Sequence, residues 1–243
     1  MIDVHSHLDL YPDGLALARK VNVRNEFTLV VTTSPRAYQA TSRVFGELRN
    51  IHVALGLHPE VLEAKFVELE QLVSGIKGAR FVGEVGLDGT PKLRKSFELQ
   101  QRAFQAVLTE CRLQGGRIIS IHSRGAAQQV IVALAAAGDV GVPLLHWFSG
   151  GVAELRMASR LGCWFSVGPA MLTSEKGRSL LAQMPMNRVL PETDGPFTEQ
   201  NGVTLRPWDA WRVCTVLSEV WGMSLDEVEH QLRSNLTKLL QLG

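Results

Sequence analysis

Histidines in this sequence gather where predicted strands end. Of the seven histidines, five lie at or just past the carboxyl end of a short apolar run: His5, His7, His58, His122 and His146. The carboxyl ends of barrel strands meet at one face, so these imidazoles are expected to come close together. His52 opens a run and His230 lies inside a helical pattern. Both are expected to be structural, as lone histidines usually are.

His5 and His7 are the first candidate metal ligands. They stand two residues apart on one predicted strand, so their side chains point to the same face. The alternative is that this pair is only the polar end of a strand. A histidine also stands at the end of the predicted strand in each of the segments IISIHSR and PLLHWFSG. Asp194 follows a later strand, in PETDGP. Imidazoles from three strands and a carboxylate from a fourth are a ligand set for one or two divalent ions.

Glu84 stands at the end of another strand, in FVGEVGLD. Its two carboxylate oxygens could bridge two metal ions, or the residue could cap the next helix or pair with an arginine. The converging histidines favour the bridge. Two ions on one carboxylate can hold a water and stabilise both oxygens of an in-line displacement, which suits phosphoester hydrolysis. Asp194 could ligate one ion and act as general base toward the attacking water.

Eight apolar runs are expected to position these residues as buried parallel strands, namely Ile2–His5, Phe27–Thr33, Ile51–Leu57, Arg80–Val85, Arg117–Ile121, Val142–Trp147, Cys163–Val167 and Arg188–Leu190. Helical periodicity marks the segments between them, such as Glu60–Ile76, Lys95–Gln114 and Gly125–Ala137. Eight strands alternating with helices predict an α/β fold, a single (β/α)₈ TIM barrel over residues 1–243. A doubly wound open sheet would require a glycine-rich loop after the first strand, and none is present.

Two further features concern the ends of this pattern. Pro191 cannot donate to a strand ladder, so a bulge or an early end is expected there. The segment after Trp208 predicts two helices on the outside of the barrel. The second would start at Ser224, with Glu227 at capping-box spacing.

Composition limits the classes of function. With 25 Lys and Arg against 24 Asp and Glu, the net charge is +1, which argues against coating long stretches of duplex DNA. The three cysteines are widely spaced and predict no disulfide framework. The amino terminus lacks the pattern of a signal peptide, and no apolar stretch approaches the ~20 residues of a membrane span. A cytoplasmic protein without membrane association is expected.

Six motifs, DVHSHLD, GLHP, GEVGLD, IHSR, HWFSG and ETDGP, stand in an order that resembles the TatD family of metal-dependent deoxyribonucleases, within the amidohydrolase-like TIM barrels. The resemblance runs from Ile2 to about Leu239. It implies a first metal site made of His5, His7, Glu84 and Asp194. It implies a second metal site made of Glu84, His122 and His146. It further implies that His58 and Glu192 lie beside these sites, toward substrate phosphate or an additional ion.

The sequence departs from the usual family pattern near the expected site. Gly89 and Thr90 replace an aromatic pair after GEVGLD, and Trp147 follows the sixth-strand histidine. No expected metal ligand is lost. The chain is therefore similar to divergent TatD-like proteins of Qat-type anti-phage operons, and this similarity implies an ATPase and a QueC-like protein as partners.

The resemblance implies DNA as substrate, with single strands trimmed from a 3′ end. An exonuclease neutralises only a few phosphates, so the near-neutral net charge is compatible with this function. Arg124 is the first candidate for phosphate, because a guanidinium binds phosphate through two bonds. Phe148, Phe197 and Trp208 could stack on bases. The remaining basic residues near the strand ends are expected to be ordinary solvated charges: Lys92, Arg94, Lys95, Lys176, Arg178 and Arg206.

The metal and the exact reaction stay open at this point. A histidine-rich site favours Mn²⁺, Zn²⁺ or a related ion, whereas the family resemblance implies activity with Mg²⁺. Two alternatives to the nuclease would use or keep the same ligands. One is ester or amide hydrolysis, such as D-aminoacyl-tRNA deacylation. The other is a non-catalytic metal-binding module in a defence complex.

Overall fold

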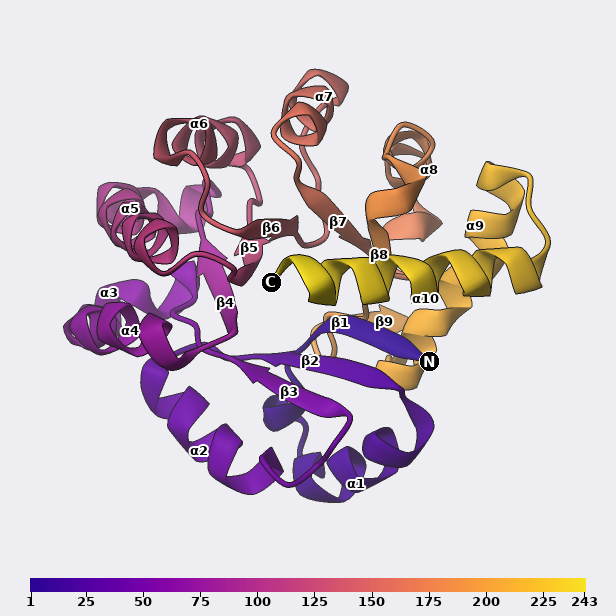
Figure 1. Cartoon of the computed structure of the whole chain (residues 1–243), viewed down its shortest axis with the longest axis horizontal. Coiled ribbons are helices and arrows are strands. Elements are labelled where there is room, and N and C mark those ends of the chain that lie inside the picture. Colours follow the sequence, from indigo (N-terminus) through magenta and orange to yellow (C-terminus); the bar gives the residue numbers. More distant parts are fainter.

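The chain folds into a ring of eight parallel strands surrounded by helices (Figure 1). The computed structural model describes residues 1–243. The strands are β1 (Ile2–Ser6), β2 (Phe27–Val31), β3 (Ile51–Ala54), β4 (Phe81–Gly86), β5 (Ile118–His122), β6 (Val142–Leu145), β7 (Trp164–Val167) and β8 (Val189–Pro191). All eight predicted strands are thus present, although β2, β3, β6 and β7 are shorter than expected. Strand β8 includes Pro191 as its last residue, paired in regular register with Val167, so the expected bulge is absent and the strand ends with the proline.

Two sheets make up the ring, one with the order β1-β2-β3 and one with the order β4-β5-β6-β7-β8. Backbone hydrogen bonds join them on one side, where the Leu55 N–H donates to the Phe81 carbonyl at 3.0 Å. On the other side, the chain after β8 bonds to β1, because the Asp194 N–H donates to the His5 carbonyl at 2.9 Å. This is the predicted (β/α)₈ barrel.

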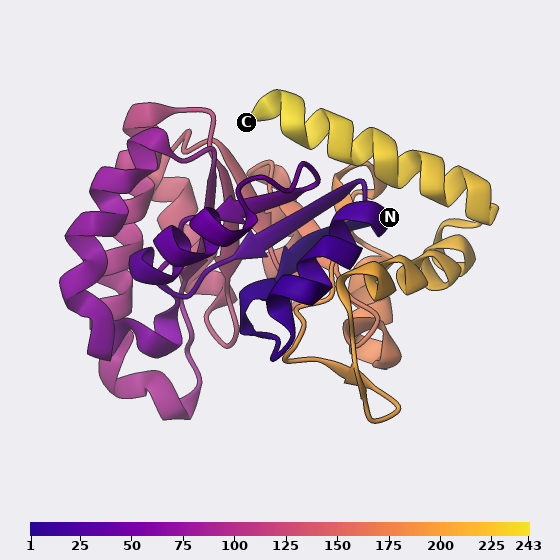
Figure 2. The same ribbon diagram turned by 90° about the horizontal axis from the view of Figure 1, so that it is seen from below.

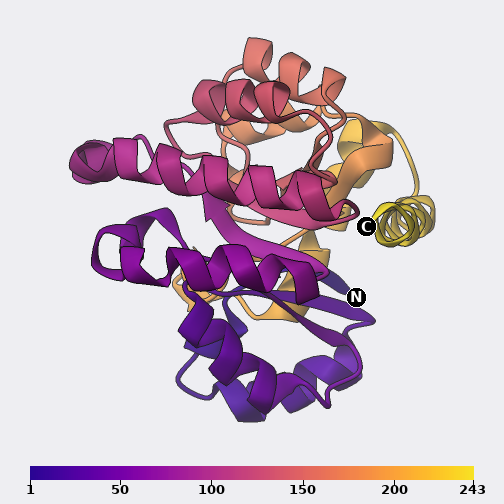
Figure 3. The ribbon, with the colours of Figure 1, turned by 60° about the vertical axis from the view of Figure 1, so that its left-hand side comes forward.

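Ten α-helices accompany the strands, and most of them pack around the outside of the ring (Figure 3). They are α1 (Gly14–Arg24), α2 (Pro35–Phe45), α3 (Leu62–Lys65), α4 (Leu69–Gly75), α5 (Phe97–Gln114), α6 (Ala127–Ala137), α7 (Val152–Arg160), α8 (Glu175–Leu181), α9 (Val213–Trp221) and α10 (Leu225–Leu242). A short antiparallel hairpin of β9 (Glu199–Gln200) and β10 (Val203–Thr204), which the sequence did not predict, follows β8.

The predicted single helix over Glu60–Ile76 is wrong. The segment is divided into α3 and α4 by a 3₁₀ turn at Phe66–Glu68. Glu68 in this turn is buried, and its carboxylate accepts hydrogen bonds from the backbone N–H of Arg36 and from Lys65 Nζ. These bonds hold the turn against the start of α2, so that tertiary contact overrides the helical periodicity.

Helix α10 covers the amino-terminal end of the barrel, whereas the sequence placed it on the outside. Leu236 and Leu239 of this helix join the core cluster that contains Ile2, Phe27 and Phe81. Figure 2 shows α10 along one end of the molecule and the β9–β10 hairpin near the opposite end. The barrel is therefore closed at one end, and its carboxyl strand ends face the other.

None of the helices combines the length and the apolar character that a membrane-spanning segment needs.

Candidate metal centre

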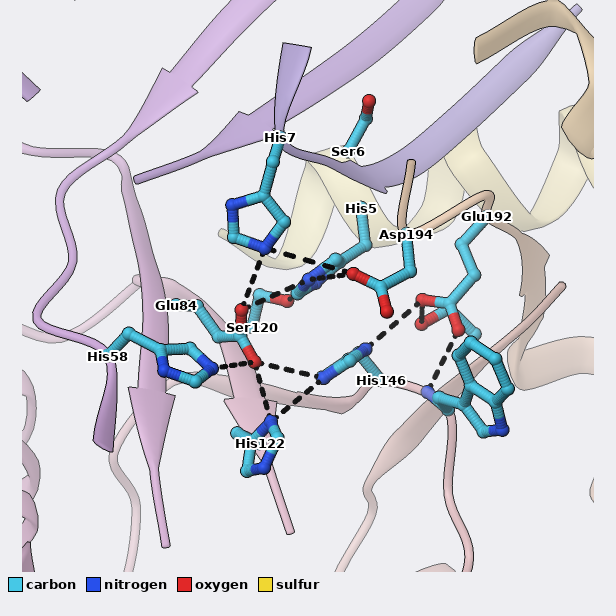
Figure 4. A network of polar contacts seen from close by, with 12 residues as sticks. His5, Ser6, His7, His58, Glu84, Ser120, His122, His146, Glu192 and Asp194 are labelled. Atoms are coloured by element: carbon cyan, nitrogen blue, oxygen red, sulfur yellow. Dashed lines mark hydrogen bonds and ion pairs between the residues drawn. The ribbon is translucent and has the colours of Figure 1, made fainter. Parts of the chain in front are cut away.

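Glu84 lies at the centre of the group of histidines at the carboxyl ends of the strands (Figure 4). It comes from β4, a strand whose six residues are all buried. Its neighbour Gly86 has φ +135°, and a Cβ atom there would lie 2.2 Å from the carbonyl oxygen of His122. Only glycine allows β4 to approach the end of β5 this closely. The motif GEVG thus places the carboxylate next to the ligands of the neighbouring strand.

One oxygen of Glu84 faces β1 and the loop after β8. Glu84 Oε2 lies 3.1 Å from His7 Nε2 and 3.4 Å from His5 Nε2. Asp194 completes this group, because its Oδ1 lies 3.7 Å from His5 Nε2 and 3.8 Å from His7 Nε2. Two imidazoles and two carboxylates therefore point at a common centre. We call these residues the first half-site.

The other oxygen of Glu84 faces β5, β6 and the loop after β3. Glu84 Oε1 lies 2.7 Å from His122 Nδ1, 3.0 Å from His146 Nε2 and 3.2 Å from His58 Nε2. His122 and His146 also face each other, with 3.3 Å between Nδ1 and Nε2. We call this group the second half-site. His58 is the most distant of the three from this oxygen, at 3.2 Å against 3.0 Å for His146.

The donor atoms of both half-sites suit divalent metal ions. His5 is fully buried, yet its Nε2 has no hydrogen-bond partner. A buried polar atom without a partner is costly, and a metal ion between His5 and the two carboxylates would satisfy it. Burial, and the stacked ring of His146 at 3.8 Å, lower the pKa of His5. The imidazole is thereby held neutral, which is the form that binds metals.

The surroundings of Glu84 and Asp194 shift the pKa values of these two carboxylates in opposite directions. Burial by itself would raise the pKa of Glu84, but His58, His146 and His5 around it hold that pKa well below its usual range. Glu84 is therefore an ionised carboxylate surrounded by nitrogen donors. Burial raises the pKa of Asp194, despite the neighbouring histidines.

The histidine nitrogens that face away from the centre meet a second layer of polar residues. His5 Nδ1 lies 2.8 Å from Ser120 Oγ, and His122 Nε2 lies 2.9 Å from Asp88 Oδ2. Such contacts select one tautomer and fix the ring orientation of a metal ligand. Asp88 was missed by the sequence analysis. Its position four residues after Glu84, in the same motif, was the only available signal.

Glu192 occupies the second layer beside His146. It is fully buried, its Oε2 accepts a hydrogen bond from Ser166 Oγ at 2.6 Å, and it lies 3.7 Å from His146 Nδ1. Its other oxygen, Oε1, accepts the backbone N–H of Trp147 at 2.9 Å. Glu192 thus contacts both a candidate ligand and the loop after β6.

Asp3 connects β1 to the loop that carries Asp194, and no sequence pattern singled this residue out. Its Oδ1 accepts the backbone N–H groups of His5 and Thr193, each at 3.1 Å. Its Oδ2 accepts the hydroxyl of Thr193 at 2.6 Å. Burial raises the pKa of Asp3 well above its ordinary value. One buried side chain, that of Asp3, therefore joins β1 to the loop after β8, the two segments that supply His5, His7 and Asp194 to the first half-site.

A cavity of about 370 Å³ opens beside the metal centre. It is lined by His122, Ser123, Arg124, His146, Trp147, Ser149, Asp194 and Phe197. Arg124 is exposed on its edge. Ser123 is buried, and its hydroxyl has no hydrogen-bond partner. The cavity thus offers one guanidinium and one free hydroxyl next to the candidate ligands.

The other residues considered from the sequence lie elsewhere. Phe148 is fully buried in the main core, and Trp208 packs under the guanidinium of Arg24. Four basic residues are engaged outside the metal centre: Lys92 with Glu60, Lys176 with the Ser149 carbonyl, Arg178 with Glu219 and Arg206 with Asp13.

The two histidines expected to be structural also lie outside the centre. His52 stacks on Phe27 at 4.7 Å, and His230 is exposed on α10.

Comparison with known proteins places this chain among metal-dependent hydrolases. The family described as TatD related DNase matches residues 2–241. The human protein named deoxyribonuclease TATDN3 is 27% identical, over 98% of this chain and 94% of its own. The Escherichia coli protein named uncharacterized metal-dependent hydrolase YjjV is 28% identical, over 99% of this chain and 98% of its own.

Solved structures agree on the architecture. The crystal structure of Escherichia coli YjjV, described as a TatD homologue, superimposes with a TM-score of 0.87 at 27% identity and covers 99% of this chain and 97% of its own. An uncharacterized amidohydrolase from Saccharomyces cerevisiae superimposes with a TM-score of 0.79 at 17% identity, over 98% of this chain and 99% of its own. The second likeness concerns the fold alone.

Proposed function

The chain belongs to the family of TatD-related DNases, and we propose that it is a deoxyribonuclease that uses two divalent ions to trim single strands from the 3′ end. Membership in the family makes it a metal-dependent hydrolase. The number of ions, the type of strand and the direction of cleavage are the proposed part. One observation carries the two-ion proposal. The two carboxylate oxygens of Glu84 face two separate groups of donors.

In this proposal the first half-site holds one ion, through His5, His7, Glu84 and Asp194. The second half-site holds the other through Glu84, His122 and His146, with His58 as a further donor. The histidine-rich ligand set suits Mn²⁺ or Zn²⁺, and carboxylate oxygens also accept Mg²⁺. Two such ions, when bound, would supply a water of lowered pKa and would stabilise the attacking and leaving oxygens of a phosphoester.

The residues around the ions have separate roles in the proposal. Asp194 lines the cavity, and its carboxylate takes the proton of the attacking water as general base. Arg124 binds a phosphate oxygen from the edge of the cavity, and the unpartnered hydroxyl of Ser123 offers a hydrogen bond to the same group. Glu192 holds His146 and the loop after β6 in place.

Two features support a strand end as the substrate. A cavity of about 370 Å³ has the size of a small-molecule site, which can take the end of one strand. The net charge of +1 provides little attraction for a long duplex, while a strand end requires few phosphate contacts. The participation of this protein in anti-phage defence, with an ATPase and a QueC-like partner, stays a prediction.

The proposal is tested with 5′-labelled and 3′-labelled single-stranded DNA in the presence of Mg²⁺, Mn²⁺ or Zn²⁺. We expect metal-dependent release of mononucleotides, and the label that is lost first gives the direction. The Asp194→Ala protein should lose at least about 100-fold in rate, in line with the usual contribution of a positioned general base. Chelation should abolish cleavage of every substrate.

The Glu84→Ala protein provides the control for the two-ion arrangement. Because the carboxylate faces both half-sites, this variant should bind neither ion, as measured by metal analysis after dialysis. Retention of one or two tightly bound ions would contradict the bridging role.

Release of the amino acid from a D-aminoacyl-tRNA, without cleavage of any DNA, would instead favour the deacylase.

A further inference from the structure

Two aromatic side chains border the cavity beside the metal centre. Trp147 comes from the loop after β6, and Phe197 comes from the segment between β8 and β9. They are the only hydrophobic residues in the lining, which otherwise consists of histidine, serine, arginine and aspartate. An aromatic surface can stack on the base of a nucleotide, and neighbouring polar groups can bind its phosphate.

The backbone of Trp147 is held in an unusual conformation. Its φ is +36°, a value that bulky residues rarely adopt and that other contacts must maintain. The buried carboxylate of Glu192 provides such a contact, because it accepts the Trp147 N–H at 2.9 Å. Part of the indole packs against the main core, and part lines the cavity. The backbone that carries the indole is therefore held in place by Glu192, and the indole itself is half-buried between core and cavity.

Phe197 is unusually exposed for a residue next to buried ligands. Its side chain and backbone together retain 64% of their accessible surface. The ring lies edge-on to His7, with 5.1 Å between the ring centroids, and the Phe197 N–H donates to the Asp194 carbonyl at 3.1 Å. Exposed aromatic surface of this kind, anchored to the site, is typical of binding surfaces.

The loop after β4 does not supply an aromatic residue on the other side of the cavity. Gly89 in this loop donates its N–H to the Arg124 carbonyl at 2.9 Å. A Cβ atom at Gly89 would lie 2.2 Å from the carbonyl oxygen of Gly125. The loop is thus packed directly onto the backbone that carries Arg124, and no larger side chain fits there. Trp147 and Phe197 are thus the two hydrophobic rings that line this cavity.

We propose that Trp147 and Phe197 form a subsite for the terminal nucleobase of a single strand, which stacks on the indole while Arg124 binds the adjacent phosphate. This inference rests on the proposed function and adds the requirement for an unpaired base. A base in a duplex end is already paired with its partner strand, so it cannot enter the subsite without fraying. Stacking on a ring face is tolerant of sequence, so all four bases should be accepted.

The test measures affinity, so that it stays separate from catalysis. A fluorescent single-stranded thymidine decamer is compared with decamers whose 3′-terminal or 5′-terminal nucleotide is abasic, by anisotropy, with Mn²⁺ and the Asp194→Ala protein. Removal of the base at the bound end should weaken binding about tenfold, the usual effect of one stacked base. When the Trp147→Ala substitution is added to the Asp194→Ala protein, its affinity for the intact decamer should fall by the same factor. The intact and abasic decamers should then bind equally.

Two controls separate stacking from general damage. Trp147→Phe keeps an aromatic face and should keep most of the preference for the intact decamer. Trp208→Ala removes an aromatic residue outside the cavity and should leave that preference unchanged. An unaltered preference in Trp147→Ala, or equal binding of all three decamers, would overturn the proposal. If base-dependent binding is found but the wild-type protein cleaves no DNA, the proposed function fails and the base subsite stands.

Discussion

Single side chains determine how the candidate ligands of the metal centre are oriented. Each histidine of the centre has one nitrogen directed to Glu84, and for His5, His122 and His146 a polar residue lies near the other nitrogen. The position of each candidate ligand at the end of a strand could be predicted from the sequence. Of the second layer, Glu192 could be expected beside the site from the family resemblance. Asp3 and Asp88 could not be predicted, because they act through contacts that only the folded chain creates.

Asp88 provides the sharpest test of this second layer. Replacement by alanine removes the acceptor of His122 Nε2 and frees the ring to rotate. Loss of such a partner typically lowers metal affinity or activity 10- to 100-fold. We expect a decrease in this range for Asp88→Ala, measured by calorimetric titration with Mn²⁺ and by kcat/KM on single-stranded DNA.

Asp88→Asn is the matched control for this prediction. The single amide oxygen can still accept a hydrogen bond from His122 Nε2, but the side chain then no longer accepts the Thr90 N–H, which Asp88 Oδ1 accepts at 2.8 Å. This variant should lose less affinity than the alanine variant. Equal affinity of wild-type and Asp88→Ala protein for Mn²⁺ would show that His122 needs no orienting partner.

At the scale of elements, local signals predicted the start of helices better than their course. The capping box at Ser224 and Glu227 is formed as expected, since the Glu227 N–H donates to Ser224 Oγ at 3.3 Å and the Ser224 N–H donates to Glu227 Oε2 at 2.8 Å. The break between α3 and α4 and the path of α10 across the barrel end could not be predicted. Both depend on partners far away in the sequence. Glu68 depends on Arg36, and α10 depends on the amino-terminal ends of the strands.

The cap of α10 has a measurable effect on stability. Ser224→Ala removes the side-chain acceptor at the first turn, and loss of such a cap costs about 1 kcal/mol. We expect the free energy of unfolding to decrease by about this amount in urea denaturation followed by circular dichroism. Ser224→Asp, which keeps an acceptor, should retain the wild-type value. Unchanged stability in the alanine variant would mean that α10 is held by its core contacts alone.

At the scale of the whole molecule, the three cysteines report on the integrity of the barrel. Cys111, Cys163 and Cys214 are all buried and unpaired. Burial raises the pKa of each thiol to about 12, because the interior disfavours the charged thiolate. At pH 8 the thiols therefore stay protonated, and the reactive form is almost absent.

Alkylation by iodoacetamide at pH 8, followed by mass spectrometry, tests this expectation. The native protein should remain unlabelled over a time in which the urea-unfolded chain takes up three adducts. A single fast-labelled cysteine in the native protein would indicate that the layer covering that residue opens readily.

The closure of one barrel end by α10 has a consequence for the way a strand would be shortened. Leu236 and Leu239 seal the amino-terminal end, so the metal centre is reached from one side only. A strand cannot thread through the protein, and each released nucleotide must leave by the route through which the strand arrived. The remaining strand has to withdraw before its next residue can enter. Degradation is therefore expected to be distributive, with intermediates of every length present in solution, because the site is a dead end and has no exit channel.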